Sequence, residues 1–137
     1  MRGQASMEWL MLGLLALTLL LVAAGAVMRM QGAQAGLAER RVLQLQVQEM
    51  AYYANSICVL GEGNAQALDL APMEFMLSYN GSGHELVMAG KGGGAQTARV
   101  ACPVNVEKAG GWGTRAYLYY EPQNGRAGVR VSDRPQP

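Results

Sequence analysis

An uninterrupted apolar run near the N-terminus limits the folds that this chain can adopt. Residues 9–28 contain no charged side chain, and they follow a short basic leader with Arg2 and a single carboxylate, Glu8. As a helix these 20 residues span about 30 Å, the thickness of the hydrocarbon core of a bilayer. A secretory signal carries its cleavage site after the apolar stretch, whereas here the small and polar residues precede it. We therefore expect the apolar segment to stay on the mature protein.

Three residues at this end of the chain form a recognisable pattern. Gln4, Ser6 and Glu8 follow a three-residue leader that ends in Gly3, and the apolar run begins directly behind them. This arrangement resembles the class III signal peptide of archaeal type IV pilin-like proteins, whose pattern is Gln-x-Ser-x-Glu after a short charged leader. The resemblance implies that a prepilin peptidase cuts between Gly3 and Gln4, so that Gln4 becomes the mature N-terminus. The alternative is a signal anchor of an unrelated small membrane protein.

Behind the apolar run the sequence becomes amphipathic. The apolar residues recur at spacings of four and three, which places them on one face of a helix: Leu43, Val47, Met50, Ala54 and Ile57. The polar residues of this stretch, among them Gln46, fall mostly on the other faces. This pattern predicts one long helix over residues 4–57, with residues 9–28 as the membrane-spanning or filament-core part. Residues 1–3 are the leader that the resemblance implies.

Two glycines interrupt the predicted helix. Gly32 and Gly36 each cost about 1 kcal/mol relative to alanine in a helix interior. One interpretation is a locally loosened or bent helix. The other is a pair of small residues that lets a second helix approach closely.

Residues 58–137 read as a small head domain built of strands. Turn signals divide them into short β-type runs, which we expect over residues 67–70, 74–79, 85–89, 97–106, 117–120 and 129–131. Residues 90–94, Gly-Lys-Gly-Gly-Gly, are expected to form a flexible loop. The fold predicted for the whole chain is α+β: a long N-terminal helix followed by a small antiparallel β-sheet. The segments around Ile57-Cys58-Val59 and Arg99-Val100-Ala101-Cys102 also resemble, loosely, the sheet that follows the helix in pilin-like proteins.

The two cysteines, Cys58 and Cys102, both follow the apolar run. The resemblance implies a cytoplasmic leader and an external head, and paired cysteines in an extracytoplasmic domain usually form a disulfide. We therefore predict a Cys58–Cys102 bond, with two free buried thiols as the alternative.

Glu8 is the residue to which we assign the most important role. A carboxylate beside hydrocarbon is costly unless it finds a partner, by about 2.5–3.5 kcal/mol at mid-span. Processing would supply one, because the new α-amine of Gln4 in one subunit can pair with Glu8 of a neighbour and set the register of assembly. Glu8 would also lie in the first helical turn, where the helix dipole favours negative charge. The alternative is a carboxylate that only caps the helix at the lipid headgroups.

The head domain offers one candidate modification site and no evident catalytic site. Asn80 begins the sequon Asn80-Gly81-Ser82 in a predicted hairpin turn, where it either carries a glycan or simply favours the turn. His84 stands alone, and Lys91 lacks the spacing of a phosphate-binding loop. We expect no enzyme activity, no metal and no cofactor. Because 11 basic and 10 acidic residues nearly balance, we also expect no nucleic-acid partner.

The predicted function follows from the resemblance. It implies a structural subunit of a type IV pilus-like surface filament that serves in adhesion. The precursor would be held in the cell membrane with its head outside. The implied partners are copies of itself, the prepilin peptidase, and an assembly ATPase with its membrane platform. The alternative is a membrane-anchored minor component or binding module that builds no filament.

Overall fold

The computed structural model describes the backbone of residues 2–135 and the side chains of residues 7–135. The chain forms one helix, α1 (Arg2–Leu60), followed by seven strands in two sheets, which confirms the α+β class. By its internal contacts the chain divides into two units, Met1–Leu37 and Ala38–Pro137. The backbone of α1 is helical at both Gly32 and Gly36, and a Cβ added to either would meet nothing within 4 Å.

The helix ends three residues later than the sequence predicted. Gly61 follows the last helical residue, Leu60, with a φ of 79°, and its N–H donates to the carbonyl of Ile57 (2.9 Å). A glycine in the left-handed region is the usual way to close a helix, because it lacks the Cβ that would make this conformation costly. Gly61 therefore fixes the boundary.

The strands divide between two sheets. They are β1 (Ala65–Asp69), β2 (Phe75–Asn80), β3 (Glu85–Gly90), β4 (Ala95–Arg99), β5 (Val104–Val106), β6 (Arg115–Tyr120) and β7 (Val129–Ser132). One sheet has the order β1-β6-β7-β5 and the other the order β2-β3-β4. All pairs are antiparallel except β5 with β7, which is parallel. The sequence predicted neither the division into two sheets nor the parallel pair.

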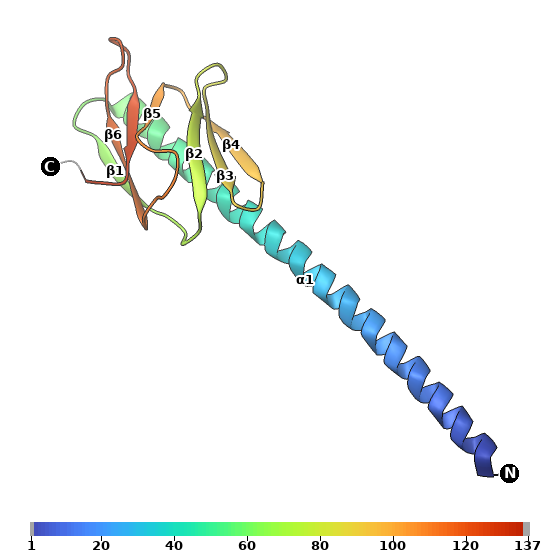
Figure 1. The fold of residues 1–137 in the computed structure, drawn as a ribbon. Helices are drawn as coiled ribbons and strands as arrows, with labels where there is room; N and C mark the ends of the chain where they lie inside the picture. Colours follow the sequence, from blue (N-terminus) through green and yellow to red (C-terminus); the bar gives the residue numbers. More distant parts are fainter. Residues whose placement is uncertain (1, 136–137) are drawn as a thin grey trace. The chain divides into compact units, whose positions relative to one another are not determined.

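One face of α1 forms a common core with both sheets. The five apolar residues predicted for this face are at most 3% exposed. They share a hydrophobic cluster with Leu77 and Leu86 of one sheet and with Leu118 and Val131 of the other. Both sheets accordingly lie beside the C-terminal part of α1 (Figure 1). Gln46, which we expected on the polar side, is buried at 8% exposure because it lies at the border of this face, next to Val47.

The expected strand over residues 97–106 is wrong. The chain leaves the three-stranded sheet after Arg99 and joins the four-stranded sheet at Val104, so that two strands replace one. Val100 and Cys102 are nevertheless buried, at 4% and 5% exposure, in the crossing between the sheets. Pro103 at this point has no N–H to donate to a ladder. The alternating apolar residues of 97–106 therefore predicted correctly which side chains are buried. They did not predict that the segment forms two strands in different sheets.

The glycine-rich segment 90–94 is a tight turn rather than a flexible loop. Gly90 N–H donates to the carbonyl of Gly94 (3.0 Å), and Gly92 N–H donates to Oε1 of Glu39 on α1 (3.3 Å). A Cβ on Gly90 would overlap Glu39 Oε1 and lie 2.8 Å from Cδ1 of Leu43. The turn thus approaches α1 more closely than a residue with a side chain would allow.

This close approach makes Gly90 sensitive to substitution. Gly90→Ala is expected to lower the free energy of unfolding of the head by about 1–3 kcal/mol, because overpacking forces neighbouring groups to shift. Chemical denaturation of the full chain in detergent measures the change. Gly81→Ala is the matched control, since its Cβ meets only an ordinary contact with Tyr79 at 3.7 Å. Equal stability of the two variants would contradict the prediction.

Candidate assembly surface of the N-terminal helix

The described residues of the first unit expose apolar side chains on every face of α1. From Met7 to Leu37 the large apolar side chains are between 52% and 76% exposed, with Val27 the least and Trp9 the most exposed. A helix that is apolar all round is stable only when something apolar surrounds it. This half of α1 therefore needs lipid or other helices as its environment.

The helix has the length and composition of a membrane span. Within residues 7–135 it is the one helix that meets this criterion, with a mean hydropathy of 2.6 in its most apolar window. A signal sequence near the N-terminus would meet the same criterion. Gly13 leaves a shallow hollow on this surface, lined by Trp9, Leu10, Leu14 and Leu17.

Glu8 is exposed at the start of the apolar half. No ion pair or hydrogen bond to its carboxylate occurs within the described side chains. In the full chain the helix begins at Arg2 and has no acidic residue in its first turn. Glu8 thus lies beyond the first turn of the full chain, where the dipole effect fades. Our expectation concerns a chain that begins at Gln4, and for that chain it stays a prediction. Gly3 and Gln4, the predicted processing residues, lie outside the residues whose side chains the structure describes.

The disulfide joins the end of α1 to the crossing between the sheets. Cys58 and Cys102 are bonded across a sequence separation of 44, with their Cα atoms 6.4 Å apart. Ala101 N–H also donates to Oδ1 of Asn55 (2.6 Å), which adds a second tie between α1 and the crossing. A disulfide is typical of extracytoplasmic domains.

The predicted turn at Asn80 is present. Asn80 is exposed at the end of β2, and its Oδ1 accepts hydrogen bonds from the N–H (3.2 Å) and hydroxyl (2.7 Å) of Ser82. The Nδ2 atom, where a glycan would be attached, makes no hydrogen bond among the described residues. His84 is also exposed, with a φ of 51°, and its Nδ1 lies 3.0 Å from the hydroxyl of Tyr79.

The sequence did not reveal a cleft in the head. This cleft has a volume of about 460 Å³ and lies between β2, the end of β3 and the loop that carries Trp112. The rings of Phe75 and Trp112 are nearly parallel, with centroids 6.4 Å apart. Lys91 and Glu74 form an exposed ion pair (3.0 Å) among the lining residues. The lining comes from three segments that are distant in the sequence, 73–76, 89–91 and 110–112, so local patterns could not have predicted the cleft.

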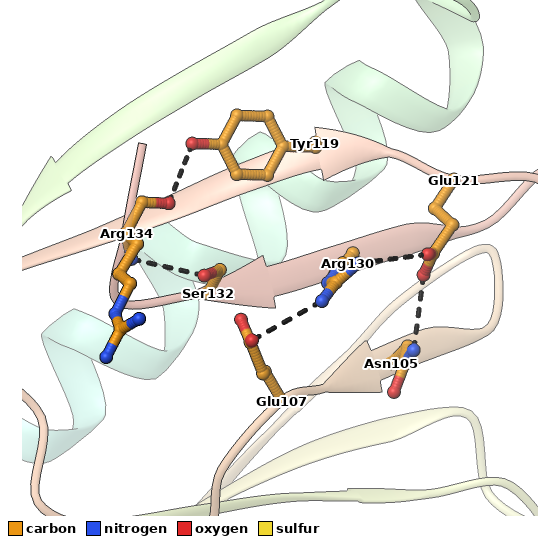
Figure 2. Close-up of polar contacts among 7 residues, drawn as sticks. All are labelled: Asn105, Glu107, Tyr119, Glu121, Arg130, Ser132 and Arg134. Atoms are coloured by element: carbon orange, nitrogen blue, oxygen red, sulfur yellow. Dashed lines mark hydrogen bonds and ion pairs between the residues drawn. The ribbon is translucent and has the colours of Figure 1, made fainter. Parts of the chain in front are cut away.

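Polar groups of the four-stranded sheet converge on Arg130. Figure 2 shows its guanidinium between Glu107 (3.4 Å) and Glu121 (3.5 Å), while Asn105 donates to Glu121 (3.2 Å). The pKa of Glu107 is lowered chiefly by a hydrogen bond from Ser132; burial opposes this shift, and the charge and hydrogen bond of Arg130 add to it. The pKa of Asp133 is lowered mainly by its hydrogen bond with Lys108.

These two lowered pKa values predict acid sensitivity of the head. A carboxyl whose pKa is lower in the folded state stabilises the fold above its unfolded pKa, about 4.3 for Glu and 3.9 for Asp. That stabilisation is lost as the pH falls through the folded-state values. We expect the thermal midpoint of the head to decrease when the pH is lowered below about 4. The fall should be smaller in a Ser132→Ala/Lys108→Met variant, and an unchanged pH profile in that variant would contradict the assignment.

The molecule has a pilin-like architecture: a long N-terminal helix, apolar in its first half, whose second half packs against a β-sheet head. Comparison of the chain with protein-family models, curated proteins and solved structures found no match.

Proposed function

We propose that this chain is a structural subunit of a surface filament of the archaeal type IV pilus-like kind, serving in adhesion. The observation that carries the proposal is the continuous helix whose described first half is apolar and exposed on every face. In the membrane such a surface anchors the precursor. Away from lipid the same surface would drive bundling, at about 25 cal/mol per Å² of apolar area buried.

The N-terminal pattern supplies the processing step. A prepilin peptidase would remove residues 1–3 and leave Gln4 as the mature N-terminus. The new α-amine of one subunit would then pair with the Glu8 carboxylate of the next. An assembly ATPase and membrane platform would drive subunits from the membrane into the filament, with the heads outside the cell.

The mature N-terminus is the measurement that tests this proposal. Mass spectrometry of the protein from its native host is expected to find a chain that begins at Gln4, and electron microscopy is expected to find filaments that contain it. A mature chain that begins after Met28, or still carries Met1, would remove the basis for assembly through Glu8.

A second function is favoured by the cleft beside Trp112. A membrane-anchored binding module, or a minor pilin-like component, would use the same leader and helix without building a filament. The stacked rings of Phe75 and Trp112 and the mostly apolar lining are typical of a ligand pocket. Cells that process and export the chain but display no filaments containing it would favour this alternative.

A further inference from the structure

Three large apolar side chains of the second unit are exposed at intervals of seven residues along α1. Leu45, Tyr52 and Val59 are 66%, 67% and 83% exposed. Seven residues are nearly two helical turns, so the three side chains lie within about 40° of one another around the helix. We call these three residues the apolar stripe.

The apolar stripe lies on the side of α1 opposite the core. Nine residues are two and a half turns, which places two residues on opposite sides of a helix. Tyr52 lies nine residues after Leu43, and Val59 lies nine residues after Met50, both fully buried core residues. A helix with one face in a core is expected to be polar at this position. The stripe therefore departs from the pattern that packing within one chain requires.

The flanks of the stripe limit what can cover it. Arg41, Gln48 and Glu49 lie beside it and are exposed. Charged flanks this close argue against insertion of the stripe into lipid, where each charge would be costly. Two stripes packed on each other would bury only three residues from each chain. The stripe is narrow, so it instead suits a partner helix whose own apolar surface is broad.

We propose that the apolar stripe packs against residues 9–28 of a second copy of this chain. Those residues offer an uncharged helical surface, and at about 30 Å the surface is longer than the roughly 21 Å from Leu45 to Val59. A seven-residue interval is the spacing at which two helices stay in contact when they cross at a small angle. In this arrangement the sheets, on the opposite side of α1, face away from the apolar helices. The inference rests on self-assembly of the chain as proposed above.

Charge substitutions on the full chain test the stripe. Leu45→Glu and Tyr52→Glu are each expected to lower the amount of chain recovered in filaments at least tenfold, with the thermal midpoint of the head in detergent unchanged. Tyr52 also contacts the ring of Tyr53 (centroids 5.5 Å apart), which is why Leu45 is tested beside it. The matched control is Gln44→Glu, an exposed residue of the same helix away from the stripe. Assembly of both stripe variants at the level of this control would overturn the proposal.

Cross-linking identifies the occupant. Tyr52 is replaced by the photoreactive p-benzoylphenylalanine, and filaments are assembled from a mixture of ¹⁴N- and ¹⁵N-labelled chains. We expect mixed-isotope cross-links to the tryptic fragment that ends at Arg29. Cross-links to head strands, or between two stripes, would overturn the stripe proposal while leaving filament formation intact. Failure of the unmodified processed chain to assemble would instead overturn the proposed function, and the stripe proposal with it.

Discussion

Replacing Glu8 with alanine is expected to reduce assembly of the processed chain at least about 100-fold. In the proposed filament the Glu8 carboxylate pairs with the α-amine of a neighbour's Gln4 among apolar helices. Removing one partner of such a buried pair costs about 3–5 kcal/mol, because the other charge is left without compensation. Each 1.4 kcal/mol corresponds to about a tenfold change in an association constant. The measurement is the fraction of chain recovered in filaments after equal export.

The control for this prediction is Glu74→Ala, which removes an exposed carboxylate from the head, away from the apolar stripe. It should assemble as the unmodified chain does. The thermal midpoint of the head should be the same in both variants, since Glu8 lies in the first of the two units. Normal assembly of Glu8→Ala would favour the alternative role, a carboxylate that only caps the helix at the lipid headgroups.

Removal of the disulfide is expected to have the largest effect on the head. Cys58→Ser/Cys102→Ser should lower the free energy of unfolding by about 4 kcal/mol, the loop-closure entropy for a 44-residue separation. For a unit of this size that corresponds to a fall in the thermal midpoint of at least about 15 °C. Circular dichroism of the full chain in detergent follows the transition.

Reduction of the unmodified chain provides the control. Dithiothreitol should lower its thermal midpoint to that of the double variant and should leave the variant itself unchanged. A midpoint in the unmodified chain that does not respond to reductant would mean that Cys58 and Cys102 are free thiols, the alternative left open by the sequence.

The sequence predicted best those features that depend on one segment alone. The buried face of α1 follows from helical periodicity, and each of its five predicted residues lies in the core. Five of the six predicted strands have observed counterparts whose ends differ by at most two residues. Turn chemistry marks these boundaries locally, as at Gly61 and Asn80.

Features that depend on contacts between distant segments could not be predicted from local sequence patterns. Alternation at Val100, Cys102 and Val104 reports burial, but it does not show that the chain changes sheets at Pro103. The turn at Gly90 looked flexible because its contact with Glu39 comes from 51 residues earlier in the chain. The cleft at Trp112 depends likewise on its packing against Phe75.

The two attachments of α1 to the head have a mechanical consequence. The turn at Gly92 holds the helix at Glu39, near the start of the second unit, and the disulfide holds it at Cys58, near the helix end. Tension applied along α1 would therefore load the hydrogen-bonded contact first and the covalent bond last. The contact between Gly92 and Glu39 would break first, and the disulfide at Cys58 would still hold the head on the helix.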